Sequence, residues 1–224
     1  MSLVEACISR FKYVRVLDLS DSSFEVLSSS ISTLKHLRYL NLSRNINLKK
    51  LPNSICKLHN LQTLLLEECD NLKRLPKDIK NMISLRFLVV KTKHICLLEN
   101  GVGCLNSLRY LAIVGCKSLK CLFDGMDGCL AYLRALVVTR CPSLTCLSVN
   151  IKHLTALETL IIRNCKVLCL TEGKDSQDLK LSLRKLVVKG VQKLEVLPQW
   201  LQGSADTLQF LQVEHCDNFK VLPE

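Results

Sequence analysis

Cysteine is the residue type in this 224-residue chain whose number and spacing could support chemistry. There are thirteen cysteines, and a thiolate can serve as a nucleophile, a metal ligand or half of a disulfide. Six of them form close pairs: Cys116 with Cys121, Cys141 with Cys146, and Cys165 with Cys169. A zinc site needs four converging ligands, but no C-x-x-C motif occurs, and the five histidines share no fixed spacing with the cysteines. The sequence therefore predicts no metal site, and stoichiometric zinc in the purified protein would contradict this.

The chain also lacks the short motifs that hold phosphates or nucleotides, or that present a serine nucleophile. No G-x-x-x-x-G-K-[ST], G-x-S-x-G, H-E-x-x-H or G-x-G-x-x-G occurs. We therefore predict no catalytic, cofactor-binding or metal-binding residue and no cofactor, and we interpret the chain as a binding protein and not an enzyme.

The cysteine spacing belongs to a repeat that covers most of the chain. An apolar residue followed by others three and five positions later recurs at nine starts: Val14, Leu37, Leu61, Leu85, Leu108, Leu133, Leu157, Leu183 and Leu208. Positions counted from these starts are called offsets below. The period of 23 to 26 residues is typical of the leucine-rich repeat. We assign residues 1–13 to an entry segment and residues 14–224 to one repeat domain.

Each repeat should supply one short strand. Apolar residues at offsets three and five, such as Leu64 and Leu66, would point to one buried side because strand side chains alternate. The returning half carries Leu-Pro in LPNSI, residues 51–55, and LPKDI, residues 75–79, and proline disfavours regular sheet. These features predict an α/β solenoid, a horseshoe of about nine repeats with parallel strands on the concave face and a mostly irregular convex side.

Two repeats depart from the pattern. The fourth has Lys93 at offset eight and no proline in its returning half. The seventh carries the polar run TEGKDSQD, residues 171–178, which predicts a surface loop and the preferred site of proteolysis.

Offset eight is where most of the cysteines with a fixed spacing fall. It holds Asn45, Cys69, Cys116, Cys141, Cys165 and Cys216. In leucine-rich repeats this is the asparagine or cysteine position, and a thiol there is a small buried group and a weak donor to carbonyls. Reactive cysteines need exposed, electropositive surroundings. We therefore interpret these six residues as structural.

Outward residues at offsets two, four, six and seven form the predicted protein-binding face. They are Tyr39, Asn41, Leu65, Glu67, Glu68, Phe87, Val89, Tyr110, Ala112, Val137, Arg140, Ile161, Arg163, Lys185, Val187, Lys189, Phe210 and Gln212. The middle six residues of offset four are apolar, and monomers rarely leave such a row in water. The alternative is that β-branched residues simply favour a pleated surface.

Arginine recurs at offset one and accounts for six of the +11 net charge. This arginine ladder consists of Arg15, Arg38, Arg86, Arg109, Arg134 and Arg184. Nucleic acid is disfavoured because there is no recognition helix, stacking motif or zinc knuckle, and an acidic protein surface fits better. The sequence leaves open whether the apolar row or the arginine ladder is the contact surface.

The location follows from what the sequence does not contain. The N-terminal residues do not read as an export signal, and no run of eighteen apolar residues could span a membrane. We expect a soluble, cytoplasmic protein with reduced thiols, with the nucleus or a membrane surface as further possible locations.

Two stretches carry a resemblance to a known family. FKYVRVLDLSDSSFEVL, residues 11–27, and LKHLRYLNLSRNINLKKLPNSICKLHNLQTLLLEECDNLKRLP, residues 34–76, resemble the leucine-rich-repeat region of plant nucleotide-binding immune receptors, especially the coiled-coil class. The resemblance implies a disease-resistance role: an arm that senses a pathogen effector, directly or through a guarded host protein, and holds an adjoining nucleotide-binding module inactive.

The nucleotide-binding module and the signalling domain of that family are not in this chain. No nucleotide-binding residue can therefore be assigned, and we expect the chain to be a fragment of a longer receptor or a truncated product. The second hypothesis is a free-standing intracellular repeat scaffold of the Ras-associated type. A phosphate-loop reading frame directly upstream in the genome would favour the receptor, and a stop codon and promoter there would favour the scaffold.

Overall fold

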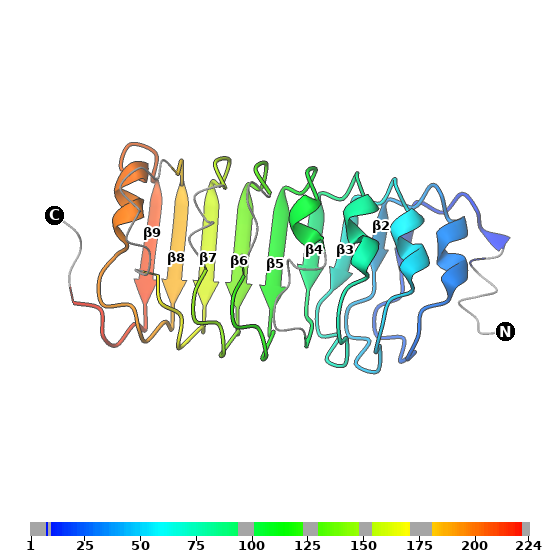
Figure 1. Cartoon of the computed structure of the whole chain (residues 1–224), viewed down its shortest axis with the longest axis horizontal. Helices are drawn as coiled ribbons and strands as arrows, with labels where there is room; N and C mark the ends of the chain where they lie inside the picture. The colour runs from blue at the N-terminus through cyan, green and yellow to red at the C-terminus, as the bar shows by residue number, and fades with distance from the viewer. Residues whose placement is uncertain are drawn as a thin grey trace.

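One parallel sheet runs through the whole protein, as the computed structural model shows (Figure 1). The structure describes residue 8 and residues 10–93, 101–122, 130–147, 154–170 and 181–220. Nine strands lie side by side in chain order: β1 Val16–Asp18, β2 Tyr39–Asn41, β3 Thr63–Leu66, β4 Phe87–Val90, β5 Tyr110–Val114, β6 Ala135–Thr139, β7 Thr159–Arg163, β8 Lys185–Lys189 and β9 Phe210–Glu214. The predicted solenoid of one strand per repeat is confirmed.

The register of the sheet stacks equal offsets on one another. Leu40 pairs with Leu64, and Leu64 with Leu88, all at offset three. Burial alternates along each strand, so that Leu64 and Leu66 are completely buried while Thr63 and Leu65 are half-buried. The predicted inward direction of offsets three and five is confirmed. We call the other side of the sheet, which carries offsets two, four and six, the open face.

Short 3-10 helices occupy the returning halves of several repeats. They are η1 Ser29–Thr33, η2 Asn53–Lys57, η3 Lys77–Asn81, η5 Val102–Cys104 and η8 Gln199–Ser204. The helices η2, η3 and η8 each begin directly after a proline of the Leu-Pro motif. Proline suits this place because its fixed φ favours the turn and its missing N–H is not needed there. Regular helix is scarce in the described part of the chain, as predicted.

The backbone at the strand entries is hydrogen-bonded regardless of which side chains stand there. The Arg15 carbonyl accepts from the Arg38 and Tyr39 N–H groups at 2.8 and 3.0 Å, and the same pattern recurs from repeat to repeat. Because the backbone N–H and carbonyl groups here bond to one another, the offset-one and offset-two side chains are available for contacts outside the sheet.

A left-handed residue ends the strand segment of eight repeats. At offset seven, φ is positive in every repeat except the fourth: Asp21, Arg44, Glu68, Gly115, Arg140, Asn164, Gly190 and His215. This conformation turns the chain so that the next residue points inward, although it is costly for residues other than glycine. This row was not predicted from the sequence, although the recurrence of glycine and asparagine at offset seven could have indicated it.

In the fourth repeat a different residue points inward after the strand. Lys93 at offset eight is exposed, and Thr92 takes the inward place with 3% of its surface exposed. The Thr92 hydroxyl donates to the Lys73 carbonyl at 2.9 Å, and its N–H donates to the Cys116 sulfur at 3.4 Å. A β-branched threonine strongly disfavours the left-handed turn, which explains the local shift by one residue.

Two features lie beyond what the structure covers. The predicted loop at residues 171–178 is outside the described residues, as is most of the entry segment 1–13. Across the described ranges, no helix combines the length and the apolar character that crossing a membrane requires.

Candidate functional site

The offset-four residues form one continuous row across the open face. The sheet register pairs them in sequence: Asp18, Asn41, Leu65, Val89, Ala112, Val137, Ile161, Val187 and Gln212. Leu65, Val89, Val137 and Ile161 are half-buried, so each offers apolar surface to a partner. The N-terminal end of the row is polar because it consists of Asp18 and Asn41. The Asn41 amide donates to the Asp18 carboxylate at 3.1 Å.

Ala112 and Val187 correct the expectation that this row is evenly exposed. Ala112 has 3% of its surface exposed and Val187 has 1%. Alanine is the shortest side chain of the row and is paired with the larger Val89 and Val137 on either side. Val187 stands between two lysines of its own strand, whose long aliphatic stems can cover it. The accessible apolar surface therefore consists of two patches separated by Ala112.

Aromatic residues of the offset-two row lie beside the apolar row. The Phe87 and Tyr110 rings are 5.9 Å apart in a tilted arrangement, and Phe87 is 47% exposed. Burial, followed by the nearby Glu67 carboxylate, raises the pKa of Tyr110. At the other end, the Lys185 ammonium sits 4.8 Å from the centre of the Phe210 ring. Tyr39 is half-buried in the same row. Exposed aromatics of this kind are common interface anchors.

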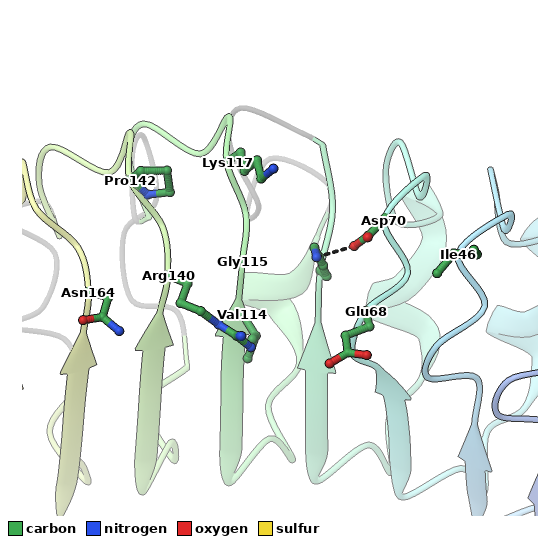
Figure 2. Close-up of a pocket in the computed structure, with 10 residues that line it drawn as sticks. Ile46, Glu68, Asp70, Val114, Gly115, Lys117, Arg140, Pro142 and Asn164 are labelled. Carbon is green, nitrogen blue, oxygen red and sulfur yellow. Dashed lines mark ion pairs between the residues drawn. The ribbon is translucent and has the colours of Figure 1, made fainter.

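A charged hollow of about 490 Å³ lies at the carboxyl ends of the middle strands (Figure 2). Its charged lining residues are Glu68, Asp70, Lys91, Lys117 and Arg140. The Lys91 ammonium pairs with the Asp70 carboxylate. Figure 2 shows the Arg140 side chain extending from the end of its own strand toward Val114. The hollow therefore joins the acidic third repeat to the basic repeats that follow it.

Opposite charges meet across several strands at this hollow. Arg140 lies 4.0 Å from a Glu67 oxygen, and Arg44 lies 3.8 Å from Glu68. The strands β3 and β6 are separated by roughly 14 Å at the usual strand spacing, so only long side chains can span that gap. These ion pairs are largely exposed and are worth at most about 1 kcal/mol each. A charged partner could exchange them for its own contacts at little cost.

The offset-six row continues the charge pattern toward the C-terminal repeats. Arg163 is exposed and is paired in the sheet with Lys189, which in turn pairs with Glu214. The Lys189 ammonium lies 2.9 Å from the Glu214 carboxylate, and hydrogen bonds from Lys189 and Gln212 lower the pKa of Glu214. Gln212 is therefore engaged within the face, whereas Arg163 points a positive charge to solvent.

The arginine ladder runs along the edge where the strands begin. Five of its members are exposed, and Arg109 is half-buried. The Arg109 guanidinium lies 5.1 Å from the centre of the Tyr132 ring and donates to the Tyr132 carbonyl at 3.3 Å. Within the described residues, none of the six arginines forms an ion pair. The ladder is thus a predominantly positive edge, in which Glu158 stands between Arg134 and Arg184.

The offset-eight side chains point into the turn backbone. Asn45 is completely buried and donates to the Leu19 and Leu42 carbonyls at 2.8 and 2.7 Å. The Cys69 thiol donates to the same Leu42 carbonyl at 3.1 Å. Longer thiol-to-carbonyl contacts of 3.9 to 4.0 Å, each to the preceding repeat, recur at Cys116, Cys141, Cys165 and Cys216. The last three thiols also donate at 3.4 to 3.5 Å to the carbonyl two residues earlier in their own repeat. These residues cap the carbonyls where each strand ends.

Burial makes the thiols of Cys69, at offset eight, and Cys56, elsewhere in the core, poor nucleophiles. It raises the pKa of Cys69 to about 11, and burial together with Asp78 raises the pKa of Cys56 to about 12. Because the thiolate is the reactive form, both side chains stay protonated at neutral pH.

The raised thiol pKa values predict a loss of stability at high pH. An unfolded thiol ionises near 9.0, whereas folded Cys69 keeps its proton to about 11, so the unfolded state is favoured as the pH rises between these values. Each pKa unit corresponds to about 1.4 kcal/mol. Urea unfolding from about pH 8 to about pH 11 should show a smaller pH-dependent loss in Cys69→Ala than in the wild type. Equal slopes for the two proteins would contradict this.

The described side chains provide no metal centre. Across the ranges that the structure covers, no group of three or more histidine, cysteine, aspartate or glutamate side chains could hold a metal ion. The surface features found are instead two apolar patches, exposed aromatics, a charged hollow and a basic edge.

Comparisons with known proteins find matches to the repeat region of this chain and to its fold. A sequence model described as "Leucine-rich repeat region" matches residues 2–218. The leucine-rich repeat domain of the type III effector XopL is similar in structure, with a TM-score of 0.75 and 20% identity, over 98% of this chain and 76% of that one. An internalin of Listeria monocytogenes has a TM-score of 0.52 and 14% identity, over 81% of this chain and 83% of that one. At such identities the likeness shows the fold alone. A search of curated proteins gave no significant match.

Proposed function

We propose, since the chain belongs to the leucine-rich repeat family, that its open face is a protein-binding surface. The observation that carries the proposal is the offset-four row, in which Leu65, Val89, Val137 and Ile161 stay partly exposed on a continuous sheet. Apolar side chains aligned on a rigid surface favour binding to a complementary protein, because burying them removes apolar area from water.

The order of charges along the hollow would orient a bound partner. Glu67 and Glu68 stand at its N-terminal side, and Lys91, Lys117 and Arg140 lie beyond them. A partner that presents basic groups to the third repeat and acidic groups to the later ones would match this order. The arginine ladder adds an edge suited to further acidic side chains, and we prefer protein to nucleic acid as the partner.

Our finer proposal is that the chain is the effector-sensing and autoinhibitory arm of a plant intracellular immune receptor. The support for it is the resemblance of residues 11–27 and 34–76 to that family. The partner would then be a pathogen effector, a guarded host protein or an adjoining nucleotide-binding module, and the chain would act in the cytoplasm. The second candidate is the free-standing intracellular scaffold of the Ras-associated type, which the repeat architecture fits equally well.

Co-precipitation with the neighbouring reading frame tests the receptor proposal. If a phosphate-loop frame lies directly upstream in the genomic sequence, its product should bind this chain when the two are expressed as separate polypeptides. Binding would support the autoinhibitory role. A phosphate-loop product that does not bind would overturn autoinhibition, and a stop codon and promoter in place of that frame would overturn the receptor in favour of the scaffold.

A further inference from the structure

A second row of cysteines lies outside the buried offset-eight row. Cys121, Cys146 and Cys169 are half-buried, and isolated parallel bridges pair Cys121 with Cys146 and Cys146 with Cys169. The Cys146 and Cys121 sulfur atoms are 3.3 Å apart. Two half-buried thiols on adjacent repeats are therefore in contact.

The backbone bridge between the two cysteines is compatible with a disulfide. Paired residues on neighbouring strands have Cα atoms about 4.8 Å apart, and disulfides span Cα separations of about 4.4 to 6.8 Å. The Thr145 N–H and hydroxyl both donate to the Lys120 carbonyl, at 3.0 and 3.1 Å, immediately before the two cysteines. The bridge therefore places the two cysteines within the range that a disulfide spans, with their sulfur atoms already 3.3 Å apart.

We propose that Cys121 and Cys146 form a dithiol site that a hydroperoxide oxidises to a reversible disulfide. One thiolate attacks the peroxide, so that an S–O bond forms, the O–O bond breaks and one water leaves after protonation. The second thiolate then attacks the sulfenic sulfur, forming the S–S bond and releasing a second water. The two thiols lose two protons and two electrons, and hydrogen peroxide is reduced to two waters.

The buried row should not compete for the oxidant. Cys116, Cys141 and Cys165 are completely buried, so peroxide has no access to them. Position in the fold, and not the number of cysteines, therefore selects the reactive pair.

The disulfide would join the returning halves of the fifth and sixth repeats. The two cysteines are 25 positions apart in the sequence, and each repeat of a solenoid contacts only its neighbours. A covalent link at this place would oppose separation of the two repeats in the middle of the array. This site is independent of the protein-binding face and does not require the proposed function to hold.

Peptide mapping after oxidation tests the proposal. The fully reduced chain is treated with hydrogen peroxide, remaining thiols are blocked with iodoacetamide, and the digest is analysed by mass spectrometry without reduction. We expect one linked pair of peptides containing Cys121 and Cys146, which dithiothreitol restores to two thiols. Peptides with Cys116 and Cys141 should carry the blocking group only after the protein is denatured.

Two variants make the test specific. Cys121→Ser should abolish the linked pair, whereas Cys104→Ser, a change at an exposed cysteine elsewhere, should leave it intact. The absence of a linked pair in the wild type at peroxide levels that oxidise Cys104 would overturn the proposal. Sulfinic acid at Cys121 or Cys146, or a link to any other cysteine, would overturn it as well.

Discussion

Replacing Leu65, Val137 and Ile161 together by aspartate is expected to weaken partner binding at least about a hundredfold, which corresponds to about 2.7 kcal/mol. All three side chains lie in the offset-four row: Leu65 on β3 is three strands from Val137 on β6, and Ile161 is on the next strand, β7. All three are half-buried before any partner binds. A carboxylate there would become desolvated and unpaired in the interface, and an unpaired buried charge costs several kcal/mol. The affinity should be measured by titration calorimetry with the co-precipitated partner.

Control variants separate loss of binding from loss of fold. Ile83 and Val196 are 64% and 42% exposed and lie outside the offset-four row, so Ile83→Asp and Val196→Asp should change the affinity less than about threefold. The triple variant should keep the wild-type circular dichroism spectrum. Unchanged binding by a folded triple variant would refute this face, and a loss of binding in Arg86→Glu with Arg134→Glu would then identify the arginine ladder as the contact surface.

Asn45→Ala is expected to destabilise the protein by about 2–4 kcal/mol. The completely buried Asn45 side chain donates to two carbonyls at 2.8 Å or less, and its own carbonyl accepts from the Ser22 N–H at 3.1 Å. Alanine would leave all three backbone groups without this partner, in a place that water reaches poorly. Urea unfolding followed by circular dichroism measures the loss.

Asn45→Cys is the matched control for that change. Five other repeats place cysteine at offset eight, where the thiol caps one carbonyl of the preceding repeat. The cysteine variant should therefore lose roughly half as much stability as the alanine variant, because one weak hydrogen bond is kept. Equal losses in the two variants would show that a thiol at this position does not cap the turn, and would contradict the capping role assigned to the offset-eight cysteines.

The repeat made most of the fold predictable. Apolar residues at offsets three and five, such as Leu64 and Leu66, indicated both the strands and their buried side, and equal spacing from repeat to repeat indicated the register. The turn after the strand was harder to predict. Its left-handed residue can be Glu68 or Arg140 as well as Gly190. At Arg140 and Gly190, the N–H group donates to the Arg163 and Glu214 carbonyls of the next repeat, which helps to offset the cost of this conformation. In the fourth repeat Thr92 replaced Lys93 as the inward residue, because a β-branched threonine disfavours the left-handed turn that the other repeats make.

The candidate site could be predicted only in part from the sequence. The pattern indicated which residues share a row, since a strand alternates its side chains and parallel strands stack in order. Whether a residue in that row is accessible depends on its neighbours in other repeats, which is why Ala112 and Val187 proved to be buried.

By itself, the sequence determined the period, the strands, the buried side and the order of repeats, because these depend on spacing within one repeat. The tertiary structure alone decided which distant side chains meet, such as Arg140 with Glu67 and Cys121 with Cys146. Those distances depend on how closely successive repeats stack and on the direction each turn gives the chain. They are properties of several repeats packed together, and the spacing within a single repeat does not contain them.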